Sequence, residues 1–173
     1  MVELKKLTPE AIPSALEKAT RYRLLKEPDE VESICLDILE ITPDHQDALI
    51  LLLLAVTDKF QQSGLNPYYD RALKIVSRLS DAYCKSYYSG MLFEQRAKYH
   101  INQNVPGCGK VAYDWFLKAM QAYEEALAGC DPDNQDALLR WNSCARFINR
   151  HPEGRDDEDD RSETPLDTYD TPH

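Results

Sequence analysis

The feature that most constrains the fold is an unbroken run of nine apolar residues, Ala48–Val56, inside the segment Pro43–Phe60. The run contains no glycine or proline, and its leucine-rich composition favours helix over strand. A membrane-spanning helix needs roughly 18 apolar residues or more, so this run is too short to cross a bilayer. A helix that is apolar all round must be buried on several sides. We therefore expect a central helix with other helices packed around it.

The rest of the chain also predicts helices. Only 6 residues are glycine, 43% are hydrophobic, and strand-type alternation is absent. Prolines mark several helix starts, because a proline in the first turn lacks only an N–H that has no partner there. Thr8 is the expected cap of the first helix. The expected helices run from Pro9 to about Lys26, Pro28 to Ile41, Pro43 to Phe60, Pro67 to Leu79, Tyr83 to Ile101, Val111 to Ala128, and Asp131 to Arg150.

Charge divides the chain into two parts. Its 173 residues fit one domain and a tail. Residues 152–173 hold nine acidic and two basic side chains, so they carry −7 of the net charge of −10. We expect a helical domain over residues 1–151 and a disordered acidic tail over 152–173. No basic patch of the kind that binds phosphate backbones is visible, so nucleic acid is not an expected partner.

Cysteine usage and the first residues bear on location. Five cysteines are odd in number and scattered, which argues against a disulfide framework and favours reduced thiols in a cytosol. The start, MVELKKLTPE, lacks the apolar core of a signal peptide. With no expected membrane span, the default location is cytoplasmic. The cysteines are Cys35, Cys84, Cys108, Cys130 and Cys144.

An internal repeat is the clearest motif. PDHQDALILL at Pro43 returns as PDNQDALLRW at Pro132, and each copy follows an amphipathic helix. A helix, a proline turn and a second helix resemble the tetratricopeptide repeat (TPR). Gly90 with Phe93 matches the glycine and aromatic of that family's first helix. The small–large–small positions of its second helix are matched by Ala119, Tyr123 and Ala126.

The resemblance implies a short right-handed superhelix of antiparallel helix pairs. It departs from the family pattern where Leu49 and Leu138 fill positions for a large aromatic, and where Leu53 and Asn142 fill those for glycine. The chain is also similar to small bacterial TPR-like proteins with a YYSGxxxE-type segment, here Tyr87–Glu94, and a closing ALLRWNSCAR helix. That similarity implies a fold and no activity.

The resemblance also implies a binding face. TPR arrays bind partners on the concave side formed by the first helix of each repeat, which here gives an apolar groove with aromatic anchors and charged rims. We expect a non-enzymatic protein-interaction scaffold that holds a peptide or helix there. The alternative is that the apolar positions are core of a compact bundle without an open groove. The expected partner-binding residues are Leu16, Arg23, Ile50, Leu54, Tyr87, Tyr88, Met91, Glu94, Arg140 and Arg146; Thr20, Leu51, Asp58 and Ser143 share their register.

Two arginines and an acidic run in the sequence each have more than one possible role. Arg140 and Arg146 either form surface ion pairs or hold a carboxylate, including one from the chain's own acidic end. The Lys/Asn clamp by which chaperone-binding TPR proteins hold a carboxylate terminus is not seen at the matching positions. The run Asp156–Asp160 either keeps the chain soluble, binds a basic partner, or folds back on the domain.

Signals for catalysis are weak. Pro106–Lys110 resembles a phosphate-binding loop only superficially, because Val111 stands where Ser or Thr is needed and no strand precedes it. Cys108 with His100 lacks the other parts of a nucleophilic site. No metal-ligand spacing occurs, so we expect no cofactor, metal or catalytic residue. Two alternatives to a scaffold stay open: a self-associating homodimer subunit, and a small ligand-binding or enzymatic bundle.

Overall fold

A computed structural model describes residues 2–60, 65–103 and 105–151 of the chain. The described part is all-α, with seven α-helices, one 3-10 turn and no strand, as the sequence predicted. The predicted disordered tail, 152–173, lies outside the described residues. The helices are α1 (Ile12–Leu24), α2 (Pro28–Ile41), α3 (Gln46–Asp58), α5 (Asn66–Ser77), α6 (Ala82–Asn102), α7 (Cys108–Ala128) and α8 (Asp136–Arg150), and the 3-10 turn is Pro9–Ala11.

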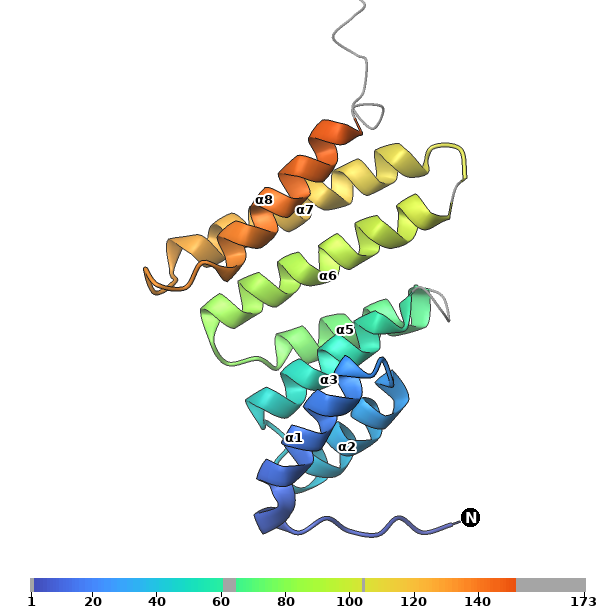
Figure 1. Cartoon of the computed structure of the whole chain (residues 1–173), viewed down its shortest axis with the longest axis vertical. Helices are drawn as coiled ribbons and strands as arrows, with labels where there is room; N and C mark the ends of the chain where they lie inside the picture. The colour runs from blue at the N-terminus through green and yellow to red at the C-terminus, as the bar shows by residue number, and fades with distance from the viewer. Residues whose placement is uncertain (1, 61–64, 104, 152–173) are drawn as a thin grey trace, which may run out of the picture.

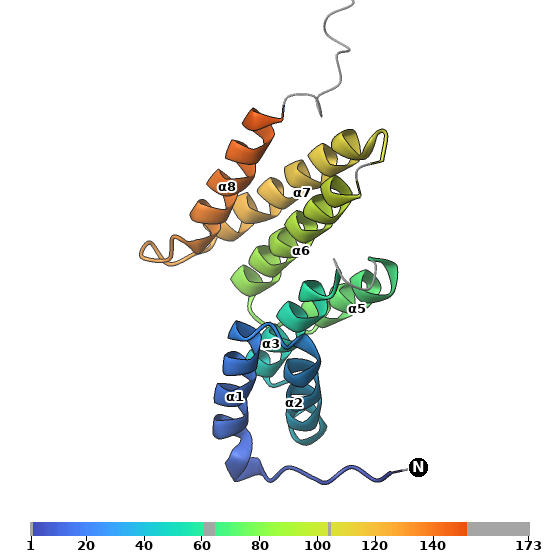
Figure 2. The same cartoon turned by 45° about the vertical axis from the view of Figure 1, so that its right-hand side comes forward.

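The helices form an elongated stack in which each one packs on the next along the chain (Figure 1). Neighbours run antiparallel because short links join them. The chain climbs from α1 at one end to α8 at the other, and the turned view shows the same order (Figure 2). Packing is much sparser between α5 and α6 than between α6 and α7. The stack therefore has a first group, α1 to α5, and a second group, α6 to α8.

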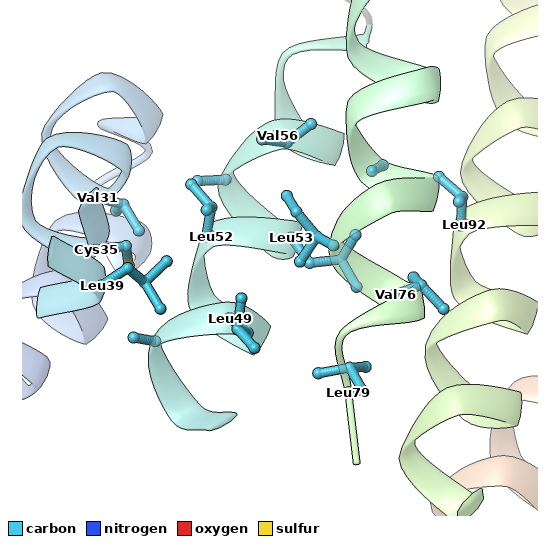
Figure 3. Packing of buried hydrophobic residues seen from close by; sticks show 14 of the residues in the cluster. Val31, Cys35, Leu39, Leu49, Leu52, Leu53, Val56, Val76, Leu79 and Leu92 are labelled. Atoms are coloured by element: carbon cyan, nitrogen blue, oxygen red, sulfur yellow. The ribbon is translucent and has the colours of Figure 1, made fainter. Parts of the chain in front are cut away.

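Helix α3 lies at the centre of the first group, as its apolar run predicted. Its side chains pack toward α2 on one side and toward α5 on the other (Figure 3). Ile50, Leu51 and Leu54 are only half-buried, so the run is not enclosed all round. Six of its nine residues are buried: Ala48, Leu49, Leu52, Leu53, Ala55 and Val56.

A second core joins α6, α7 and α8 around Phe116 and Tyr123. Gly90 of α6 lets this core close: a Cβ added there would lie 2.7 Å from the ring of Tyr123 and 3.1 Å from the carbonyl oxygen of Ala119. The two cores meet at Trp115 of α7, whose ring packs against both of them. Its ring centroid is 6.0 Å from that of Tyr69 in α5.

The predicted start of the first helix is wrong in one respect. Thr8 makes no side-chain capping bond, and α1 begins only at Ile12, after the 3-10 turn. The reason is Pro13, which has no N–H to donate to the carbonyl of Pro9. Ile12 donates to that carbonyl instead, so the first turn tightens to 3-10 geometry.

The two copies of the sequence repeat form equivalent corners, one between α2 and α3 and one between α7 and α8. The N–H of His45 donates to the carbonyl of Thr42 at 3.1 Å, and in the second corner Asn134 donates to Asp131 at 2.9 Å. The alanine that follows each corner in the motif, Ala48 or Ala137, is fully buried. The repeated sequence motif thus forms the same local structure at both places.

Candidate functional site

Most of the predicted apolar groove residues are half-exposed, and they come from three helices. Leu16 of α1, Ile50 and Leu54 of α3, and Tyr88 of α6 are each partly buried, and each packs against the first core. The fully buried residues of α3 lie on its other sides. These four side chains are therefore neither core nor free surface, and we refer to them together as the apolar strip.

Charged groups lie at one end of this strip. Arg23 Nε of α1 is 3.6 Å from Asp58 Oδ2 of α3, so the pair bridges the two helices. Arg23 Nε is buried and donates no hydrogen bond to any described group. Burial raises the pKa of Asp58, and the charge of Arg23 opposes that shift only in part. The pair lines an open cavity of about 390 Å³ with Leu24, Lys26 and Pro28.

The two adjacent tyrosines of α6 serve different cores. Tyr88 packs against the first core and Tyr87 against the second, as expected from the 100° between neighbouring helix residues. Tyr87 stacks on Tyr83 with ring centroids 5.7 Å apart. Burial and the neighbouring tyrosine raise the pKa of Tyr88 to about 12, so Tyr88 keeps its O–H at neutral pH. It offers a partner an apolar ring with a polar end.

Two predicted partner-binding residues are not on the surface. Met91 is 3% exposed and belongs to the first core. Glu94 is 1% exposed, so it is not a rim charge. The repeat register treats a whole face of α6 as open, but both cores pack against α6, and Tyr88 is its one residue in the strip.

Glu94 instead organises a buried polar cluster between α6, α7 and α8. Tyr123 donates its O–H to Glu94 Oε2 at 2.7 Å. Lys98 Nζ lies 2.5 Å from Glu94 Oε1, and Arg140 Nη1 lies 3.2 Å from the same oxygen. A carboxylate can be buried when donors satisfy it in this way. Burial opposes the charged form of Arg140, but Glu94, Tyr123 and Tyr87 together outweigh it and raise the pKa of Arg140.

Arg146 lies beside this cluster but outside it. It is exposed and lines a cavity of about 180 Å³ with Lys98, Ser143 and Arg150. The sequence prediction named Arg146 and Arg140 and missed Lys98 and Arg150. The i,i+4 spacing of Glu94 and Lys98 is the signal that would have identified Lys98.

The weaker catalytic candidates gain no supporting geometry. His100 Nε2 is buried without a hydrogen bond from the described groups, so no Cys108–His100 pair forms there. Burial and nearby Arg96 lower the pKa of His100. Gly107 caps α7 at φ 83°, and Cys108, Gly109 and Lys110 form the first turn of that helix, so the segment Pro106–Lys110 is not a flexible loop over its whole length. Within the described residues, no cluster of three or more potential metal ligands occurs.

Comparisons with known proteins add no relative. No family model, no curated protein and no solved structure matches this chain. The tetratricopeptide resemblance therefore stays a prediction based on sequence. Within the described part of the chain, every helix is too short or too polar to span a bilayer.

Proposed function

We propose that this protein is a TPR-like, non-enzymatic interaction module that binds an apolar peptide or amphipathic helix of a protein partner along α1, α3 and α6. The observation that carries the proposal is the partly covered strip of Leu16, Ile50, Leu54 and Tyr88. Peptide-binding grooves combine such apolar anchors with charged groups at the edge. Arg23 and Asp58 supply the edge here, beside a cavity of about 390 Å³.

Two further observations support the TPR-like part of the proposal. The corners at Pro43 and Pro132 have the same turn, and Gly90 fits against Tyr123 as the small and large positions of the repeat require. All five cysteines are free, which suits a reducing compartment such as the cytoplasm. The cytoplasmic location is part of this proposal.

The experiment that tests the proposal compares two leucine-to-glutamate variants of the full chain. Leu54→Glu puts a charge in the strip, whereas Leu73→Glu puts the same charge on the exposed face of α5, where Leu73 is 41% exposed. Each immobilised protein is incubated with lysate of the source organism, and the captured proteins are quantified by mass spectrometry.

We expect wild type and Leu73→Glu to capture the same partner, and Leu54→Glu to lose at least about 90% of it, because a charge in a desolvated groove has no counterpart. Circular dichroism must show that both variants stay helical. If Leu54→Glu captures the same proteins in the same amounts as wild type, the strip is not the binding surface.

A second candidate is self-association through the last helix. Leu138 and Leu139 of α8 are 38% and 63% exposed, and no described helix follows α8 to cover them. Terminal repeats of a solenoid need a polar outer face to stay monomeric. Sedimentation velocity over a hundredfold concentration range tests self-association. A sedimentation coefficient that stays at the monomer value over this range excludes the dimer.

A further inference from the structure

The cavity between α6 and α8 is strongly basic for a protein with a net charge of −10. Lys98 of α6 and Arg146 and Arg150 of α8 line it, and Arg140 lies beside it on Glu94. Glu94 is the acidic group among its lining residues. Four cations thus lie in or beside a cavity with one carboxylate, which leaves a surplus of three positive charges at this place.

These cations differ in whether they already have a partner. Lys98 and Arg140 both lie on Glu94. Arg146 and Arg150 form no ion pair with any residue that the structure describes. They are one turn apart on α8, a spacing at which like charges repel. Ser143 lies on the same side of the helix and adds a hydroxyl to the cavity. An anion between the two arginines would relieve that repulsion and receive several donors.

The chain itself carries a matching anion a short distance away. The run Asp156–Asp160 holds five consecutive acids, and its first member follows Arg150 by six residues. Six residues span at most about 20 Å. Arg150 itself lines the cavity, and Arg146 is one turn back, about 6 Å along the helix axis. The run is thus tethered within reach of the cavity, at an effective concentration in the millimolar range.

We propose that the α6–α8 cavity is a carboxylate-binding site whose occupant is the acidic run Asp156–Asp160 of the same chain, held by Arg146 and Arg150. This site is separate from the strip proposed for partner binding, so either proposal can fail without the other. The contact is electrostatic and largely exposed, so salt weakens it.

Carbodiimide coupling in the full chain tests the contact directly, because it joins an amine to a carboxylate in close contact. Arg146→Lys keeps the charge and supplies an amine in the cavity. Arg21→Lys is the matched control: Arg21 is exposed on α1, at the opposite end of the stack (Figure 1). Coupled peptides are identified by mass spectrometry in the monomer fraction.

We expect coupling of residue 146 to residues 156–160 at about 0.01 M salt, at least about tenfold above that of residue 21. At about 1 M salt, where the screening length falls to about 3 Å, this coupling should fall to the control level. Equal coupling at both positions, or coupling that survives high salt, overturns the proposal. Coupling confined to covalent dimers also overturns it, because the occupant is then a second copy.

A competition measurement gives a second, independent test. Neutralising the run in the full chain, with Asp156→Asn, Asp157→Asn, Glu158→Gln, Asp159→Asn and Asp160→Asn, removes the internal occupant. A synthetic peptide with the sequence of residues 153–161 should then bind at least about tenfold tighter than it binds wild type. Adding Arg146→Gln and Arg150→Gln to the neutralised chain should abolish that binding. Equal affinity for wild type and the neutralised chain overturns the proposal.

Discussion

Glu94 is a carboxylate with almost no contact with water, and its donors come from three helices. Removing one member of a buried ionic cluster leaves the others desolvated and unpaired, at a cost of about 3–5 kcal/mol. Lys98 and Arg140 are 41% and 36% exposed and can recover some solvation, which reduces that cost. Removing Glu94 should therefore cost more than breaking one of the exposed ion pairs that the structure describes.

The first prediction concerns Glu94→Gln, which keeps the side-chain volume and removes the charge. We expect a loss of about 2–4 kcal/mol of unfolding free energy, because the amide cannot satisfy two cations. Urea unfolding followed by circular dichroism measures it. Glu125→Gln, at an exposed position of α7, is the control and should change stability by less than about 0.5 kcal/mol. A Glu94→Gln variant as stable as that control would show that the cluster contributes nothing.

The second prediction compares two glycines in helices. Gly90→Ala should destabilise by about 1–3 kcal/mol, since its Cβ would lie 2.7 Å from the Tyr123 ring. Gly109→Ala has open space, with nothing within 4 Å, and should stabilise by about 0.5–1 kcal/mol through helix propensity. Thermal unfolding of both variants measures the difference. If both variants changed the unfolding temperature in the same direction, that result would contradict the close approach at Gly90.

Gly90 and Glu94 show what the sequence could and could not predict about single residues. The repeat pattern paired Gly90 with a small–large–small helix, and the structure places it against Tyr123. The same register put Met91 and Glu94 on an open face, yet both are buried. A repeat register assigns a face to each residue. It does not reveal how many neighbours cover that face, which depends on contacts between helices far apart in sequence.

At the scale of the elements, the two corners share a turn but differ in how they are tied to the stack. Gln46 of the first corner accepts a hydrogen bond at 2.8 Å from the N–H of Ser80, in the link between α5 and α6. Arg78, which follows the last residue of α5, adds a hydrogen bond to the carbonyl of Pro43. In the second corner, the amide of Gln135 donates to Pro132 within the turn. The second corner is tied to α6 through Asn134 Oδ1, which accepts a hydrogen bond at 3.2 Å from the O–H of Tyr83. Gln46 thus ties the first corner to another element, whereas Gln135, its match in the second corner, bonds only within the turn.

The third prediction follows from that difference. Gln46→Ala should cost about 0.5–1.5 kcal/mol, because the N–H of Ser80 loses its acceptor and the corner keeps only the tie from Arg78 to Pro43. Gln135→Ala should cost less than about 0.5 kcal/mol, because only a bond local to the turn is lost. Chemical denaturation of the two variants measures both. Equal losses would mean that the tie to Ser80 adds no stability.

Element positions were predictable because prolines and apolar spacing act locally. Six of the seven described α-helices begin within about three residues of their expected starts, and α8 begins five after Asp131, since the turn at Pro132 precedes it. The exposed side of α3 was not predictable from its composition. Nine apolar residues in a row give no signal of which side the neighbours leave uncovered, and the structure leaves Ile50, Leu51 and Leu54 partly open.

At the scale of the whole molecule, the stack has two cores that share α6 and meet at Trp115. In stacked repeats, each unit contacts mainly its neighbours, so opening can begin in one part. The sparse packing between α5 and α6 is the natural boundary for such an opening. Each core holds a buried cysteine: Cys35 is 0% exposed in the first, and Cys144 is 1% exposed in the second.

These two thiols can report separately on the two cores. Burial raises the pKa of each to about 12, so neither reacts with a thiol reagent near pH 8 while its core is closed. Labelling then requires opening, after which the thiol regains its ordinary pKa near 8.5. Under conditions where closing is faster than labelling, the rate at each cysteine reports the opening free energy of the core around it.

The last prediction is that the two cores open separately. Glu94→Gln weakens the second core by about 2–4 kcal/mol, which corresponds to a rise of about 30- to 1,000-fold in Cys144 labelling. Labelling of Cys35 should rise at least about tenfold less, since α5 holds α6 only loosely. Leu53→Ala leaves a cavity in the first core, so it should raise the labelling rate of Cys35 more than that of Cys144. Rates are read by mass spectrometry of labelled peptides. A parallel rise at both cysteines in both variants would mean that Trp115 couples the cores into one cooperative unit.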